Sequence, residues 1–238
     1  MVNEFLNDTK EYNIFSYEDY KSSSLALKLK KIELLNEYYK LIYKKEDKLP
    51  VFIDFDGVIL DTMEDAKVLL QQHHDLDWNT ISRDNAEQQA LLANFFKSLN
   101  WHTLLSGTRE INESINFLKL INDSPIYDPT IYSAINSIEE AQEKHKYIEE
   151  NIFNLEHKFT MAHTPKVSEN KRSILIDDDN FNLNNWDGYP VHFDSKIESI
   201  YPTINDLGEL YFLFYYHDDN FCINSELKEE YKKIKVIH

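Results

Sequence analysis

Short apolar runs alternate along the chain with longer stretches in which apolar residues recur every three or four positions. The runs Val51 to Asp54, Thr130 to Tyr132 and Ser173 to Ile176 have the length and composition of buried strands. Phe159 to Ala162 is a fourth, weaker candidate. Because helical patterns separate the strands, we expect an α/β fold, with a Rossmann-like parallel sheet flanked by helices.

Periodic stretches predict five helices, over residues 25–42, 62–74, 85–99, 108–121 and 137–152. Their apolar residues gather on one side, which is typical of a helix that packs on a core. In the last stretch, Ser137 and Glu140 have the spacing of a capping box. This spacing predicts that the helix begins there.

Pro50 separates two parts of different composition. Residues 1–49 are rich in Lys, Glu and Tyr, and we expect a helical extension there that packs on the core or, alternatively, supports self-association. Residues 50–62 and 107–238 then form the core, with residues 63–106 inserted after the first strand as a small helical cap. A chain of 238 residues is long enough for one such domain.

Composition narrows the classes of partner. Lys and Arg total 25 against 42 Asp and Glu, a formal charge of −17, which repels the phosphate backbone of extended nucleic acid. The same charge repels a small phosphate ester, so a site for one requires a local cation. The single cysteine, Cys222, excludes an internal disulfide, and the longest apolar run, Tyr211 to Tyr216, is too short to cross a bilayer. With no secretory pattern in the first residues, we expect a cytoplasmic protein without a membrane partner.

Polar side chains follow three of the predicted strands, at Asp54, Ser133 and Asp177. In an open parallel sheet, ligands bind beyond the carboxyl ends of the strands, so these ends indicate one site.

The segment at the first of these strand ends reads Asp54-Phe-Asp56-Gly57. A carboxylate can attack phosphorus, and a second carboxyl two residues on can protonate the leaving oxygen and then activate water. Gly57 permits a sharp turn that exposes backbone N–H groups near a phosphate.

This segment resembles the first motif of the haloacid dehalogenase (HAD) superfamily, in which Asp-x-Asp-Gly follows a buried strand. The resemblance implies that Asp54 is the nucleophile and a metal ligand. It implies that Asp56 is the general acid and base and binds the metal through its backbone carbonyl. The dehalogenases of the superfamily lack the second aspartate, so Asp56 indicates a phosphatase or a phosphomutase. For so short a motif, a capped strand-to-turn segment without chemistry is the alternative.

Ser133-Ala134 resembles the second motif of the superfamily, in which a hydroxyl and the next backbone N–H bind the phosphoryl oxygens. A simple turn residue is the alternative. The third motif is a lysine that neutralises the phosphate and the nucleophile, and Lys144 and Lys146 are both candidates. The Lys-x-x-Tyr-Ile frame that starts at Lys144 resembles the Lys-x-x-Trp-Val frame of small nucleotidases. On that resemblance we prefer Lys144, with a solvated helix face as the alternative for either lysine.

Asp177-Asp178, followed by Asn182 and Trp186, resembles the fourth motif in the form found in the deoxyribonucleotidase-like branch. Magnesium prefers oxygen ligands and usually keeps waters, so one or two carboxylates beside Asp54 can hold it. We expect Asp177 to bind Mg²⁺ directly and Asp178 to bind through water or to orient the shell. A calcium-binding loop does not fit, because the required glycine and distal glutamate are absent.

The inserted cap is the expected substrate lid. Its candidates for substrate specificity are bulky aromatic or basic side chains, namely Trp78, Arg83, Trp101 and His102. His73 and His74 are further lid residues, and since adjacent residues face different sides of a helix, they do not indicate a zinc site. Ordinary packing or solvation is the alternative for each of these side chains.

These features together predict a phosphoric monoester hydrolase that requires Mg²⁺ and works through an aspartyl-phosphate. The expected substrate is a small phosphorylated metabolite, and a nucleoside monophosphate suits aromatic side chains able to stack a base. A phosphomutase would share the first chemical step. A HAD-fold regulatory or protein-binding module with weak catalysis is the alternative from a different class.

Overall fold

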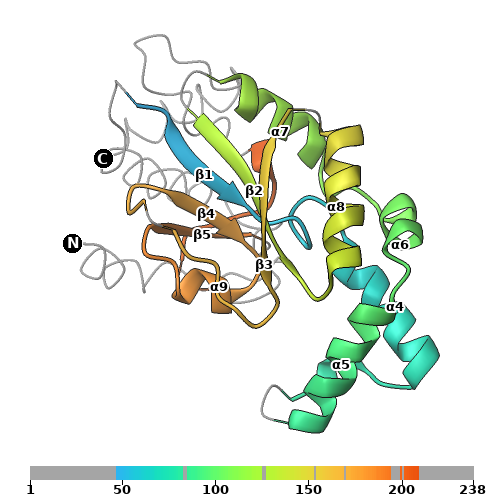
Figure 1. Ribbon diagram of the computed structural model, residues 1–238. Coiled ribbons are helices and arrows are strands. Elements are labelled where there is room, and N and C mark those ends of the chain that lie inside the picture. Colours follow the sequence, from blue (N-terminus) through green and yellow to red (C-terminus); the bar gives the residue numbers. More distant parts are fainter. Residues whose placement is uncertain are drawn as a thin grey trace, which may run out of the picture.

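The computed structural model describes residues 47–82, 85–124, 127–152, 154–168, 170–193, 199 and 201–208 (Figure 1). The predicted helix over residues 25–42 lies outside this part of the chain, as do Arg83 and Cys222. The helical extension and its role in self-association therefore stay predictions.

Six parallel strands form one sheet in the order β3-β2-β1-β4-β5-β6. Their bounds are β1 Leu49–Ile53, β2 Tyr127–Ile135, β3 Glu156–Met161, β4 Ile174–Asp177, β5 Tyr189–Phe193 and β6 Thr203–Ile204. The α/β, Rossmann-like fold class is thereby confirmed. Since the strands are parallel, all their carboxyl ends lie at one edge of the sheet, which is where ligands bind in such folds.

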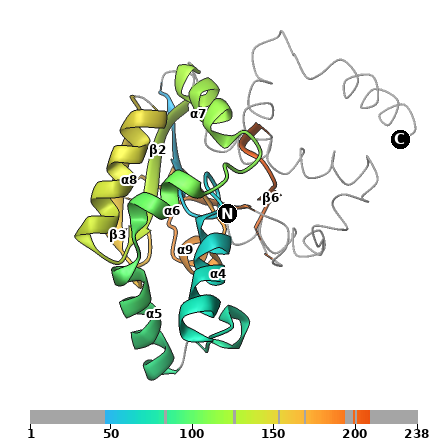
Figure 2. The same cartoon turned by 90° about the vertical axis from the view of Figure 1, so that its right-hand side faces the viewer.

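Helices flank the sheet and fill the connection between β1 and β2. They are α4 Thr62–His74, α5 Ala86–Ser98, α6 Trp101–Gly107, α7 Ser114–Asp123, α8 Ile138–Asn151 and α9 Asn180–Asn184, with a short 3₁₀ turn η1 at Trp78–Thr80. Helices α7 and α8 contact β2, and α9 contacts β4 and β5. Helices α4 and α5 extend away from the sheet, and α6 lies beside α8 (Figures 1 and 2). Within the described ranges, no helix combines the length and apolar character needed to cross a membrane.

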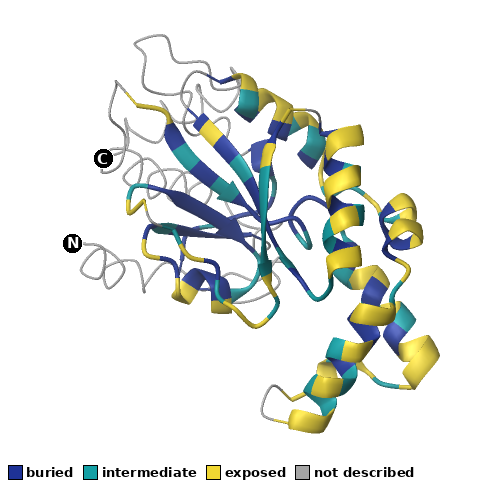
Figure 3. Cartoon of the chain, viewed as in Figure 1, coloured by how far each residue is buried: buried dark blue, intermediate teal, exposed yellow. Residues whose placement is uncertain are grey.

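The core surrounds the central strands on both faces (Figure 3). Val51 and Ile53 of β1 point into the larger apolar cluster and are fully buried. Phe52, between them, faces the other side of the sheet, where it packs on Tyr132 and Trp186. This alternation follows from the period of two along a strand. A strand buried on both faces gives the loop that follows it a rigid base.

The sequence predicted three helices closely, but β2 is longer than the predicted run Thr130 to Tyr132, and α6, α9, β5 and β6 were not predicted. Helix α4 has the predicted bounds, and α5 and α8 lie within one residue of theirs. The helix predicted from residue 108 begins only at Ser114. Residues 109–111 instead pair with the loop after β1, because Asp61 N donates to Arg109 O and Ile111 N to Ile59 O, each at 3.0 Å.

Candidate functional site

The loop after β1 makes a tight turn that places two carboxyl groups at the sheet edge. Asp54 N donates to Ile176 O at 2.9 Å, which ties the end of β1 to β4. Gly57 adopts φ +78°, and a Cβ there would lie 2.4 Å from Asp178 Oδ2. Only glycine meets both conditions without strain. The N–H of Gly57 donates to Leu60 O at 2.8 Å, so Gly57 uses this group to close the loop.

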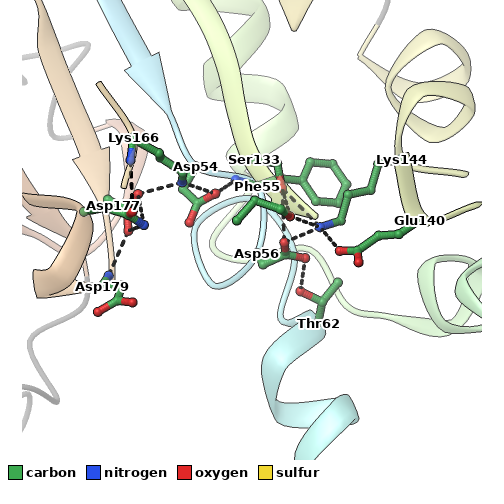
Figure 4. Close-up of polar contacts among 12 residues, drawn as sticks. Asp54, Phe55, Asp56, Thr62, Ser133, Glu140, Lys144, Lys166, Asp177 and Asp179 are labelled. Carbon is green, nitrogen blue, oxygen red and sulfur yellow. Dashed lines mark hydrogen bonds and ion pairs between the residues drawn. The ribbon is translucent and has the colours of Figure 1, made fainter. Parts of the chain in front are cut away.

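Three carboxylates meet beyond the ends of β1 and β4. The ligand atoms of Asp54, Asp177 and Asp178 all lie within 4.8 Å of one another, a spacing that could hold a metal ion. Lys166 Nζ lies 2.6 Å from both Asp54 Oδ1 and Asp177 Oδ2, and its side chain is fully buried (Figure 4). The cluster of Asp54, Asp177, Asp178 and Lys166 therefore contains three carboxyl groups and one ammonium group.

The three carboxylates differ in the number of hydrogen bonds and ion pairs that they accept from other residues. Asp177 is fully buried; it accepts from Asn182 Nδ2 at 3.1 and 3.2 Å and from Asp179 N at 2.9 Å, besides Lys166. Asp54 Oδ1 accepts from Phe55 N at 2.7 Å as well as from Lys166. Asp178 is partly exposed, and its carboxylate accepts no hydrogen bond from any residue in the described part of the chain. The cluster is therefore most open on the side of Asp178.

The charges in this cluster are poorly balanced. Burial, together with repulsion from Asp177 and Asp56, raises the pKa of Asp54 to about 7 despite the attraction of Lys166. Burial, together with repulsion from Asp177 and Asp54, raises the pKa of Asp178 well above its usual range. Burial disfavours the charged Lys166, but attraction to Asp177 and Asp54 outweighs it and raises its pKa. A bound cation would relieve this excess of negative charge.

Asp56 belongs to a separate group of polar side chains on the other side of the loop (Figure 4). Its carboxylate accepts from Thr62 Oγ1 at 2.7 Å, from Ser133 Oγ at 3.2 Å and from Lys144 Nζ. Lys144, fully buried, also donates to Glu140 Oε1 at 2.7 Å. The structure therefore brings the loop after β1 and the C-terminal part of β2 together through Asp56 and Ser133.

Helix α8 holds Lys144 in this position. Glu140 is one turn before Lys144, and its second carboxylate oxygen accepts from Asn136 N at 2.7 Å. Burial, the largest cause, raises the pKa of Glu140, and repulsion from Asp56 adds to it. For Lys144, burial opposes the charge, while Asp56 and Glu140 favour it and raise its pKa. Lys146, the other candidate on this helix, is exposed.

The lysine that contacts Asp54 is Lys166, whereas the residue assigned from the sequence, Lys144, contacts Asp56 and Ser133. Lys166 was missed because only the Lys-x-x-Tyr-Ile frame guided the assignment. A usable signal was present: Lys166 is the first lysine or arginine after β3, just as Asp54 and Asp177 stand at the ends of β1 and β4. Its place in the connection after β3, at the same edge of the sheet as Asp54 and Asp177, makes Lys166 a candidate under the strand-end rule.

The cap residues occupy different environments. Trp101 is buried, donates from Nε1 to Phe96 O at 3.1 Å, and has its ring 4.9 Å from Lys144 Nζ. Trp78 is partly exposed and packs edge-on against Phe96. His102 is exposed, with Nδ1 3.2 Å from Glu143 Oε2. The fourth specificity candidate, Arg83, lies outside the described residues.

A cavity of about 870 Å³ lies between α4, α5 and α6. His73 and His74 line it together with apolar side chains that include Leu69 and Phe95. None of the three clustered aspartates lines this cavity. The two histidines therefore line this cavity and do not belong to the carboxylate cluster.

The chain is similar to known proteins in structure but not detectably in sequence. No family model matches the sequence, and no curated protein matches it. Solved structures similar to this chain include a HAD-superfamily hydrolase of subfamily IA from Geobacter sulfurreducens, at 11% identity and a TM-score of 0.46, covering 69% of this chain and 98% of that one.

Two further similar structures have comparable scores. A protein from Bacteroides vulgatus assigned as a β-phosphoglucomutase has 10% identity and a TM-score of 0.45, covering 76% of this chain and 93% of that one. A protein from Bacillus subtilis assigned to the HAD hydrolases, and bound to magnesium, has 15% identity and a TM-score of 0.42, covering 69% of this chain and 97% of that one. At such identities and scores, these likenesses support neither an activity nor a substrate for this chain.

Proposed function

We propose that this chain is a HAD-type, Mg²⁺-dependent phosphomonoester hydrolase that forms an aspartyl-phosphate on Asp54. One observation carries the proposal. Asp54 lies against Lys166 and within metal-binding distance of Asp177 and Asp178, while a second carboxyl, Asp56, follows two residues later on the other side of the loop. A nucleophile, a cation site and a proton donor are the parts that phosphoryl transfer to a carboxylate requires.

The donor set fits magnesium. Asp54, Asp177 and Asp178 offer carboxylate oxygens, and the resemblance adds the backbone carbonyl of Asp56, so every ligand is of the hard type that Mg²⁺ prefers. Asp178 is the most available of the three carboxylates, since the oxygens of Asp177 already accept several hydrogen bonds. When bound, the ion would offset negative charge on the phosphoryl group and on the nucleophile.

In the first step, Asp54 attacks the phosphorus of the ester. Oδ1 of Asp54 is fixed by Lys166 and by the Phe55 N–H, which leaves Oδ2 to form the new O–P bond. The bond from phosphorus to the leaving oxygen breaks, and Asp56 protonates that oxygen. Lys166 offsets the charge that gathers around the nucleophile.

In the second step, water hydrolyses the acyl phosphate. Asp56, now a carboxylate, takes a proton from the water as the water oxygen bonds to phosphorus, and the bond to Asp54 breaks. Inorganic phosphate leaves and Asp54 is regenerated.

During both steps, Ser133 Oγ and the Ala134 N–H would bind phosphoryl oxygens. Lys144 would hold the side chains of Asp56 and Ser133 in position.

A small phosphorylated metabolite is the proposed substrate class. The strongly acidic surface disfavours long phosphate polymers, whereas a single phosphate can be neutralised locally by Lys166 and a metal ion. A nucleoside monophosphate is the preferred member of this class, because partly exposed Trp78 in the cap could stack on a base.

The test is a phosphomonoester panel that includes p-nitrophenyl phosphate, 5′- and 3′-nucleotides, sugar phosphates and phosphoamino acids. We expect turnover that requires Mg²⁺, is lost with EDTA and is absent in Asp54→Asn. A strong preference for sugar phosphates would contradict the nucleotide assignment. If folded wild-type protein hydrolyses no member of the panel with Mg²⁺, the chain is a binding module and the proposal fails.

A further inference from the structure

A second group of potential metal ligands lies on the outer face of helix α8 and the neighbouring strand β3. His145 and Glu149 are four residues apart on α8, so both side chains project from the same side of the helix. His157 extends from β3, the strand at the edge of the sheet. One ligand atom of each residue lies within 4.8 Å of those of the other two.

The two imidazole rings face each other through ring nitrogens. His145 Nδ1 lies 2.6 Å from His157 Nε2. The other nitrogen of His157, Nδ1, lies 3.2 Å from the carbonyl oxygen of Leu155. A carbonyl oxygen can only accept, so this contact favours the tautomer with the proton on Nδ1, in which the lone pair of Nε2 points toward His145. A backbone carbonyl that fixes the tautomer of a histidine in this way is a common second shell for a metal ligand.

We propose that His145, Glu149 and His157 form a binding site for a divalent transition-metal ion such as Zn²⁺. Two imidazoles and one carboxylate match a zinc site that keeps an open position for water. In a tetrahedral site, two bound ring nitrogens are about 3.3 Å apart, given Zn–N distances of roughly 2.0–2.1 Å. The rings therefore have to separate by several tenths of an ångström, and exposed His145 is free to make that shift.

This site is chemically distinct from the carboxylate cluster around Asp54. The cluster offers only oxygen ligands and is mostly buried, whereas the outer site offers two nitrogens and lies at the surface. Borderline ions such as Zn²⁺ favour imidazole, and Mg²⁺ does not. A metal at the outer site would join α8 to β3. Since α8 also carries Lys144 and Glu140, the ion would brace the helix that holds Asp56.

Calorimetric titration of the full chain with Zn²⁺, in saturating Mg²⁺, tests the proposal. Mg²⁺ competes for the oxygen cluster, and the loss of Zn²⁺ binding in the histidine variants measures the share that the outer site provides. We expect one equivalent of Zn²⁺ to bind in the micromolar range or tighter. His145→Ala and His157→Ala should each weaken binding about tenfold or more, and Glu149→Gln should weaken it less. His73→Ala removes an exposed histidine of α4 outside the group and should leave Zn²⁺ affinity unchanged.

A second measurement avoids any dependence on the folding of the variants. In wild-type protein labelled on histidine nitrogens, Zn²⁺ should shift the NMR signals of His145 Nδ1 and His157 Nε2 and leave those of His73 unmoved. No Zn²⁺ binding by folded wild-type protein, or binding that His145→Ala and His157→Ala leave intact, would overturn the site. Phosphatase activity does not enter either readout, so failure here is separate from failure of the proposed hydrolysis.

Discussion

Two fully buried lysines lie on either side of the loop that carries Asp54 and Asp56, and each is bracketed by two carboxylates (Figure 4). Lys166 contacts Asp54 and Asp177. Lys144, on helix α8, contacts Asp56 and Glu140. Taken pair by pair, the two arrangements look alike.

Their surroundings differ in charge. The Lys166 side includes a third acid, Asp178, and the pKa of Asp54 there is raised to about 7. Among the described residues, the Lys144 side holds two acids, Asp56 and Glu140, whose oxygens accept from Thr62, Ser133, Asn136 and Lys144. The comparison teaches that the role of a buried lysine between carboxylates depends on the other charges around it. The excess of acids on the Lys166 side favours a bound cation, whereas on the Lys144 side the lysine positions Asp56 and Ser133 through direct contacts.

The largest expected effect separates the two aspartates of the loop. Asp54→Asn removes the proposed nucleophile and should lower turnover on the order of ten-thousandfold or more. Asp56→Asn should cost on the order of a hundred- to ten-thousandfold, and less for an acidic leaving group such as nitrophenol. Mg²⁺ affinity should fall in Asp54→Asn and survive in Asp56→Asn. Full activity in Asp56→Asn would contradict its role as acid and base.

The two lysines should differ in what they do for turnover. Lys166→Met removes the charge beside the nucleophile, and we expect a loss on the order of a hundred- to a thousandfold per folded chain. Lys144→Met acts through the position of Asp56 and should cost about tenfold. Lys146→Met, an exposed change two residues further along α8, is the matched control and should be neutral. A larger loss for Lys144→Met than for Lys166→Met would reverse the assignment.

The stability of the two lysine variants should also respond differently to Mg²⁺. Removing one partner of a buried ion pair costs about 3–5 kcal/mol, so both lysine variants should unfold more easily. Mg²⁺ can replace the lost charge beside Asp54 and should restore part of the stability of Lys166→Met. It should not restore Lys144→Met. Thermal unfolding of both variants with and without Mg²⁺ measures the difference, and equal rescue of the two would contradict the comparison.

The stabilisation by Mg²⁺ should depend on pH. The pKa of Asp54 is about 7 in the folded protein against 3.8 for the ordinary side chain, so the folded state holds the proton longer. Without metal, this group therefore lowers stability as the pH rises from about 4 to about 7. Metal binding requires the carboxylate, so the rise in melting temperature on adding Mg²⁺ should be small at pH 5 and larger above pH 7. Asp54→Asn should flatten this dependence; an equal Mg²⁺ effect at every pH would contradict it.

The smallest effect is expected in the cap, outside both clusters. Trp78→Ala should change the ranking of substrates several-fold, because partly exposed Trp78 lies in the expected lid and makes none of the contacts of the carboxylate cluster. The pH dependence of turnover on a single substrate should stay the same. Steady-state kinetics on the phosphomonoester panel provides the measurement. Equal losses on every substrate would remove Trp78 from substrate selection.

Local signals explain why so much of the fold followed from the sequence. Apolar runs predicted four of the strands, and the capping-box residue Ser137 accepts from Glu140 N as expected. The helix predicted from residue 108 was too long at its start, since the pairing of Arg109 and Ile111 with the loop after β1 depends on tertiary contact. Amphipathic periodicity does not report such a contact.

The candidate site was less completely predicted, for a related reason. Asp54 and Asp177 stand at the ends of β1 and β4, where position in the sequence almost determines position in space, whereas Ser133, predicted at a strand end, lies within β2. Lys166 lies in the connection after β3, and its contact with Asp54 depends on how that connection folds back. Lys144 was found, but its partner was not, because a helix face alone does not tell which of two nearby aspartates a lysine meets.

Detection of the covalent intermediate on Asp54 tests the central claim most directly. Asp56→Asn should form the phosphoenzyme from p-nitrophenyl phosphate and Mg²⁺ but hydrolyse it slowly, so the intermediate should accumulate. Borohydride reduces an acyl phosphate to an alcohol, and mass spectrometry should then find homoserine at position 54 when substrate and Mg²⁺ are both present. Release of one nitrophenol per chain with position 54 unmodified would contradict the mechanism.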